Sequence, residues 1–190
     1  ITFQNKNLLV TYHPETLNDY SNNSLDNLLK ALEDNPGLNY IFTAPNADPG
    51  NDKIFDKISS FVNKNQKKSI LFKSLGHKNY ISCLNQVDGI IGNSSSGITE
   101  APYFKIGTIN IGKRQGGRIR AKSIIDCDSS AESISKSIDT LYSDDFQSKL
   151  KSLENPYGDG TAAYKILEII KKHDLPKNIK KKFFDINFSI

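Results

Sequence analysis

Residues Val87–Phe104 read VDGIIGNSSSGITEAPYF, and this stretch decides the fold class. It opens on a short apolar run, Val87–Ile91, which has the length and composition of a buried strand. A polar turn rich in serine and glycine follows at Gly92–Gly97, and the spacing beyond it predicts a helix over Ser96–Phe104. A strand, a loop and a helix in direct succession form the repeating unit of a parallel α/β sheet.

The same alternation extends outward over the rest of the chain. Apolar runs predict five further strands, at Leu8–Tyr12, Leu38–Thr43, Ser69–Lys73, Thr108–Ile111 and Ser123–Cys127. Helical spacing or turn signals predict the other helices, at Ser21–Glu33, Asn51–Lys64, Asn79–Gln86, Ser130–Tyr142, Asp144–Leu153 and Thr161–Lys172. This order argues for an α/β fold with three αβα layers, in which helices cover both faces of a parallel six-stranded sheet.

In a parallel sheet of this kind, ligands bind at the carboxyl ends of the strands, near the point where the strand order reverses. That rule selects the segments directly after the predicted strands: His13-Pro14, Ala44–Gly50, Ser74–His77, Gly92–Gly97 and Gly112–Arg118. These segments also hold many of the polar, glycine and basic residues. The agreement between sheet geometry and residue chemistry predicts a binding site along this edge.

The loop Gly92–Gly97 has the groups that a phosphate needs. Its serines supply hydroxyl donors, its glycines allow close backbone approach, and a helix begins at its end. The same residues are also compatible with a plain helix cap in a tight turn. Glu100 follows, and its carboxylate could accept hydrogen bonds from a ribose, although an exposed first-turn glutamate explains it equally simply.

Three other segments of the ligand edge carry candidate residues. The loop Lys113–Arg118 offers Arg114 for bidentate phosphate binding, or is a solvated basic loop. His13 could donate a proton to a leaving phosphate, or serve as a structural hydrogen-bond donor. Asn46 and Asp48 lie in a turn-rich loop, where they either face a nucleotide or form local turns.

Composition narrows the class of protein. The chain has 190 residues and a net charge of +4, with much of the basic excess in Lys113–Lys122 and Lys171–Lys182. We find no nucleic-acid-binding module, no apolar run of membrane-spanning length and no spacing of metal ligands. Its two cysteines, Cys83 and Cys127, suit a reducing compartment, and we expect a cytoplasmic location. The absence of methionine leads us to expect that an upstream part of the protein is missing.

The segment Asp88–Arg118, DGIIGNSSSGITEAPYFKIGTINIGKRQGGR, resembles the C-terminal domain of the UDP-N-acetylglucosamine 2-epimerases, especially the hydrolysing branch. The strand and His-Pro at Leu9–Pro14, the loop Pro45–Gly50, the strand Ser123–Cys127 and the LPKNIKKKF tail also resemble that family. The resemblance implies one Rossmann-like half of a GT-B fold. Residues 1–190 would form the C-terminal nucleotide-binding domain, with a basic tail at 174–190 and the N-terminal domain absent.

The resemblance also implies roles for individual residues. Ser94 and Ser95 would bind the diphosphate of UDP, Gly97 would allow its approach, and Arg114 would line the phosphate side. Glu100 would bind the ribose hydroxyls, and Asn46 would face the nucleotide. The Leu75 backbone would contact the uracil edge with Tyr80 nearby, and His13 would be the catalytic histidine beside the leaving diphosphate.

The activity implied by the resemblance is elimination of UDP and release of N-acetylmannosamine or a related 2-epimerised sugar, without cofactor or metal. The implied partners are a UDP-sugar substrate and further copies of the full-length enzyme, with no nucleic acid and no membrane. By itself the chain would be inactive. Two alternatives stay open: the nucleotide-binding domain of a GT-B glycosyltransferase, and a nucleotide-binding module without its own activity.

Overall fold

The computed structural model describes residues 3, 5–15, 23–174, 178, 180 and 183–186. The chain forms two compact units, Ile1–Tyr157 and Gly158–Ile190. The second unit holds helix α7 (Ala162–Lys172), whose Glu168 carboxylate pairs with Lys171 and Lys172. Most of the basic tail predicted for 174–190 lies outside the described residues.

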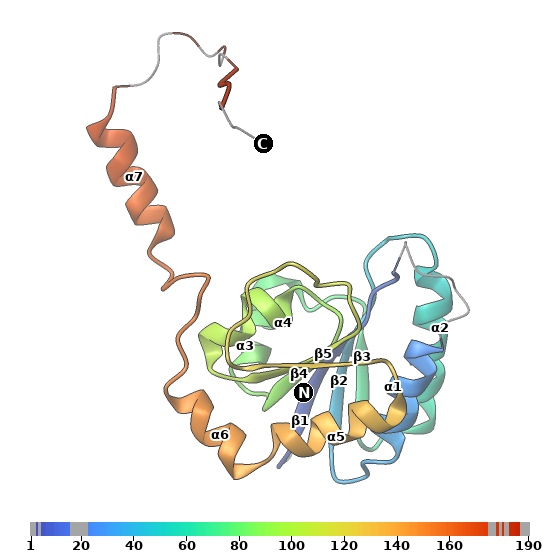
Figure 1. Cartoon of the computed structure of the whole chain (residues 1–190). Helices are drawn as coiled ribbons and strands as arrows, with labels where there is room; N and C mark the ends of the chain where they lie inside the picture. The colour runs from blue at the N-terminus through green and yellow to red at the C-terminus, as the bar shows by residue number, and fades with distance from the viewer. Residues whose placement is uncertain are drawn as a thin grey trace. The chain divides into compact units, whose positions relative to one another are not determined.

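The first unit is built on the predicted sheet of six parallel strands, in the order β3-β2-β1-β4-β5-β6 (Figure 1). The strands are β1 (Asn7–Thr11), β2 (Asn39–Thr43), β3 (Ser69–Phe72), β4 (Gly89–Gly92), β5 (Gly107–Ile111) and β6 (Ile124–Cys127). The chain moves outward in one direction from β1 to β3 and in the other from β4 to β6. The strand order therefore reverses between the adjacent strands β1 and β4, which is where such folds bind ligands.

Two apolar layers explain why the central strands have almost no polar residues. Because side chains alternate along a strand, Leu8 and Val10 of β1 enter one core cluster and Leu9 enters the other. The first cluster includes apolar residues of α1 (Ser24–Glu33), α2 (Asn51–Lys64) and α5 (Ala131–Leu141), with Phe146 and Leu150 of α6 (Asp144–Lys151). The second includes residues of α3 (Gly76–Leu84) and Ala101. The predicted three-layer αβα architecture is confirmed.

Several helix boundaries differ from the sequence prediction, and two of these differences lie near the pocket. The helix predicted over Ser96–Phe104 is divided into α4 (Ser96–Thr99) and a 3₁₀ turn, Ala101–Phe104. Pro102 lies in the first turn of the second piece, where it lacks the N–H that a continuous α-helix would use. Helix α3 begins at Gly76 instead of Asn79, because the Gly76 amide donates to Ser74 Oγ and starts the turn earlier.

Candidate functional site

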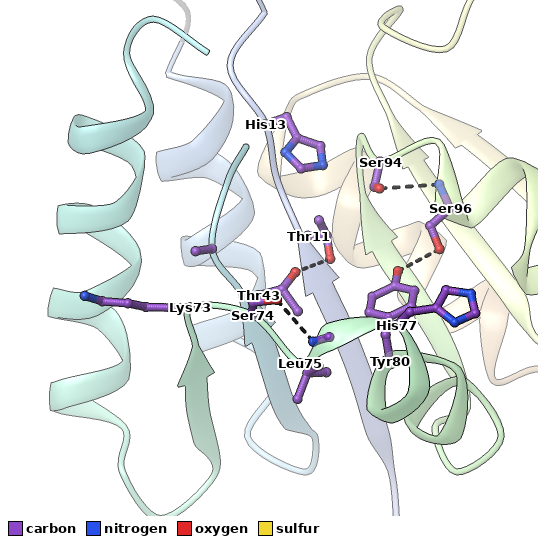
Figure 2. A pocket seen from close by; sticks show the side chains of 12 residues that line it. Thr11, His13, Thr43, Lys73, Ser74, Leu75, His77, Tyr80, Ser94 and Ser96 are labelled. Atoms are coloured by element: carbon purple, nitrogen blue, oxygen red, sulfur yellow. Dashed lines mark hydrogen bonds between the residues drawn. The ribbon is translucent and has the colours of Figure 1, made fainter. Parts of the chain in front are cut away.

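A pocket of about 320 Å³ lies at the carboxyl ends of β1, β2, β3 and β4 (Figure 2). Its lining comes from the strand ends and the segments just after them: Thr11, His13, Thr43, Ala44, Lys73, Ser74, Leu75, Gly76, His77, Tyr80, Ser94 and Ser96. The pocket therefore covers the position where the strand order reverses. Six of the twelve lining residues carry a hydroxyl group and two carry an imidazole, so the pocket offers hydrogen-bonding partners to a polar ligand.

The floor of the pocket depends on the register between β1 and β2. Thr11 and Thr43 are the last residues of these strands and lie opposite each other in the sheet. Their hydroxyl oxygens are 2.7 Å apart and share a hydrogen bond (Figure 2). Because both side chains are almost fully buried, this pair fixes the polar floor at the ends of the two strands.

Gly92 closes β4 with a backbone that only glycine tolerates. Its φ of 140° lies outside the range of ordinary L-residues, and a Cβ here would come 2.0 Å from the Thr11 carbonyl oxygen. The chain can therefore turn immediately after the strand. After the turn, the Asn93 amide donates to the Thr11 carbonyl at the end of β1, and Ser94 lines the pocket.

Asn93 connects the two strand ends with its fully buried side chain. Its Oδ1 accepts from the His13 amide at 2.7 Å, and its Nδ2 donates to the His13 carbonyl at 2.9 Å. Its own carbonyl accepts from Arg114 Nη1 at 3.1 Å and from Gln115 Nε2 at 2.8 Å. One residue therefore fixes both the segment that carries His13 and the loop that carries Arg114.

The basic loop after β5 is held by Arg120. The Arg120 Nη1 donates to the carbonyls of Gln115 and Arg118 at 3.3 Å and 2.9 Å, and its Nε pairs with Asp126 at 2.6 Å. Arg120, one of the clustered basic residues of the sequence, therefore stabilises the conformation of this loop. Arg114 is the cation of this loop that contacts the Gly92–Gly97 turn.

A line of hydroxyl groups leads from the pocket to Glu100. Tyr80 Oη donates to Ser96 Oγ at 2.7 Å, and Ser96 Oγ donates to Glu100 Oε2. Burial raises the pKa of Tyr80 to about 12, so its hydroxyl keeps its proton and acts as a donor. The Glu100 carboxylate is thereby held beside the pocket.

The imidazole of His13 has a defined partner on one side. Its Nδ1 accepts from the Asn46 backbone amide at 3.1 Å, and the Asn46 side chain donates to Asp48 at 2.5 Å. Burial and the nearby Arg114 guanidinium lower the pKa of His13, while Asp48 opposes that shift. The ring is therefore biased toward its neutral form.

The structure brings the residues singled out from the sequence into one region. His13, Leu75, Tyr80 and Ser94 line the pocket. The other five lie around it: Asn46 beside His13, Ser95 and Gly97 at the start of α4, Glu100 behind Ser96, and Arg114 on Asn93. Their predicted contacts with a nucleotide remain predictions.

Sequence reasoning missed several residues of this site. Thr11, Thr43, Lys73 and Ser96 line the pocket, and Asn93 supports it, but none was assigned a role of its own. A polar residue ending a strand that is otherwise apolar was the available signal for Thr11 and Thr43. For Asn93 the sequence offered no such signal, because asparagine is common in turns, and only its partners in the structure reveal its role.

The part of the chain that the structure describes holds neither a metal site nor a helix that could span a membrane. Within it, no three His, Cys, Asp or Glu side chains are placed to hold a metal ion. Of the helices described, none combines the length and apolar surface needed to span a bilayer. Cys83 is buried, Cys127 is partly buried, and both are free thiols.

Known proteins share sequence and fold with this chain. The sequence model of the family described as UDP-N-acetylglucosamine 2-epimerase matches residues 2–171. The chain is 38% identical over 180 residues to the GDP/UDP-N,N'-diacetylbacillosamine 2-epimerase (hydrolyzing) of Campylobacter jejuni, covering 94% of this chain and 46% of that protein. It is 36% identical over 181 residues to the polysialic acid biosynthesis protein P7 of Escherichia coli, with the same coverage of 94% and 46%.

The chain thus spans about half the length of the curated relatives it matches. Among solved structures, the UDP complex of MnaA from S. aureus aligns with a TM-score of 0.68 and 16% identity. That alignment covers 87% of this chain and 44% of the other. At this identity the likeness concerns the fold, which corresponds to one half of a GT-B-like architecture.

Proposed function

Because the chain belongs to the UDP-N-acetylglucosamine 2-epimerase family, we propose that it is the UDP-binding part of a hydrolysing sugar-nucleotide 2-epimerase. Such an enzyme eliminates UDP from its substrate and adds water, releasing N-acetylmannosamine or a related 2-epimerised sugar. The observation that carries the proposal is the pocket at the strand reversal, with His13 and Ser94 in its lining and Arg114 and Glu100 beside it. Residues 1–190 act as the C-terminal nucleotide-binding domain of a two-domain enzyme.

Most of the residues singled out from the sequence have a part in this proposal. The hydroxyls of Ser94 and Ser95 and the guanidinium of Arg114 bind the diphosphate, where charge-assisted hydrogen bonds are strongest. The Glu100 carboxylate accepts hydrogen bonds from the ribose hydroxyls. The Leu75 backbone contacts the uracil edge near Tyr80, and Gly97 leaves room for the phosphates.

His13 faces the leaving diphosphate in this arrangement. It is the residue of this chain that we place closest to the reacting bond. The sugar lies toward the second domain, so the chain alone binds UDP without turning over a UDP-sugar. We also propose that the full-length enzyme is a homo-oligomer of the cytoplasm, where the free thiols Cys83 and Cys127 stay reduced.

Calorimetry with UDP tests the binding site. Arg114→Ala and Glu100→Ala should each weaken binding by about tenfold or more, because each removes a charged group that contacts the ligand. Arg118→Ala is the matched control, since it removes an exposed cation from the same loop. Equal affinity of wild type and the two site variants would reject the assignment.

The reaction itself is tested with the full-length enzyme that contains this chain. Incubation with UDP-N-acetylglucosamine or its diacetylbacillosamine analogue should release UDP and free sugar in equal amounts, with no acceptor added. Release of UDP only in the presence of an acceptor would instead identify a glycosyltransferase. Absence of turnover with both substrates, despite UDP binding, would favour a binding module.

A further inference from the structure

His13 is held by partners on its backbone and on its ring. Asn93 pairs with both the amide and the carbonyl of His13. The Asn46 backbone amide then approaches the ring from the loop after β2, with 3.1 Å between its nitrogen and Nδ1. The position of the imidazole is therefore fixed by two loops that follow different strands, β4 and β2.

The Asn46 contact determines where the ring carries its proton. A backbone N–H can only donate, so Nδ1 must present its lone pair, and a neutral imidazole then carries its hydrogen on Nε2. Flipping the ring would place a carbon-bound hydrogen against the Asn46 N–H and lose the bond. Among the residues that the structure describes, none accepts a hydrogen bond from Nε2, and the ring lines the pocket beside Ser94 (Figure 2).

Protonation of His13 would break the hydrogen bond between the Asn46 amide and Nδ1. The added hydrogen would sit on Nδ1 and point at the Asn46 N–H, so two donors would face each other. The charged groups near the ring are Arg114, from the loop after β5, and Asp48, from the loop after β2. Arg114 repels a second positive charge, whereas Asp48 already accepts from the Asn46 side chain.

We propose that His13 acts as a neutral donor, giving an Nε2–H hydrogen bond to a diphosphate oxygen and keeping its proton. Asn46 is the positioning residue, and it acts through its backbone amide instead of facing the nucleotide with its side chain. This inference rests on the proposed function for the identity of the ligand. The tautomer, in contrast, is a property of the free chain.

The tautomer can be measured without any ligand. Long-range ¹⁵N–¹H spectra of histidine-labelled chain distinguish the pyrrole-type from the pyridine-type ring nitrogen, and His13→Gln identifies the signals of His13. At pH 7.5 we expect Nε2 to be the protonated nitrogen of His13. Asn46→Ala should leave this pattern unchanged, because it keeps the backbone N–H. An Nδ1–H tautomer or a doubly protonated ring would overturn the proposal.

Two substitutions of His13 test whether its Nε2–H donates a hydrogen bond to UDP. Glutamine places its amide nitrogen near the position of Nε2, whereas asparagine places its own near Nδ1. We expect His13→Gln to stay within about threefold of the wild-type dissociation constant and His13→Asn to lose about tenfold or more. Equal losses, or no loss in either variant, would overturn the donor role. Failure of the wild type to bind UDP would instead reject the proposed function and leave the tautomer result standing.

Discussion

Gly97 and Thr108 fix helix α4 against strand β5. The Thr108 hydroxyl donates to the Gly97 carbonyl at 2.8 Å, and a Cβ on Gly97 would lie 2.5 Å from Thr108 Cγ2. The loop that carries Ser94–Ser96 can approach the sheet this closely because residue 97 has no side chain. Glycine at this position therefore has a packing reason that is independent of any ligand.

Gly97→Ala should lower the free energy of unfolding by about 1–3 kcal/mol, because the added methyl overlaps the Thr108 side chain. The double variant Gly97→Ala/Thr108→Ser should recover at least half of the loss, since serine lacks Cγ2 but keeps the hydroxyl donor. Urea denaturation of both single variants and the double variant measures this coupling. Simple additivity of the two single effects would contradict the packing explanation.

Asn93→Ala should destabilise the first unit by about 2 kcal/mol, because it leaves the His13 amide and carbonyl without their buried partners. Asn63→Ala is the matched control, since Asn63 is exposed on α2 and should change stability by less than about 0.5 kcal/mol. Chemical denaturation compares the two. Similar effects at both positions would show that the link between the β1 and β4 ends contributes little.

The proposed contact between Glu100 and the ribose can be tested by comparing two ligands, UDP and 2′-deoxy-UDP. Glu100→Gln should weaken UDP binding by about tenfold, or about 1.4 kcal/mol, because an amide oxygen is a poorer acceptor for ribose hydroxyls than a carboxylate. The same variant should lose at most about threefold toward 2′-deoxy-UDP, which lacks one of those hydroxyls. Calorimetry with both ligands gives the comparison. An equal loss for the two would place Glu100 away from the 2′-hydroxyl.

Stability should respond to pH through His13. Since burial and Arg114 lower the pKa of His13 in the folded state, the unfolded chain binds its proton first as the pH falls. Wild type should therefore lose stability relative to His13→Gln below about pH 6.5, with no pH-dependent difference between them above about pH 7.5. Denaturation curves across this range measure the difference. A relative gain of wild type at low pH would mean that the folded state favours the charged ring.

The sequence by itself determined the succession of strands and helices along the chain, the parallel sheet and the edge of the sheet at which the pocket lies. These features follow from apolar periodicity and from the residues next to each run, which are local signals. Pro102 indicated an irregular helix, but the position of the break and the early start of α3 were not predicted, because short turns depend on single hydrogen bonds that periodicity does not record.

Only the tertiary structure decided which side chains meet at that edge. The Thr11–Thr43 pair, the link from Asn93 to His13 and the line from Tyr80 through Ser96 to Glu100 each require a particular register or packing. Two of these three contacts join strand ends that are distant in the sequence. The sequence could name His13 as a candidate, but the tautomer of its ring depends on the Asn46 amide, which folding brings to Nδ1 from the loop after β2.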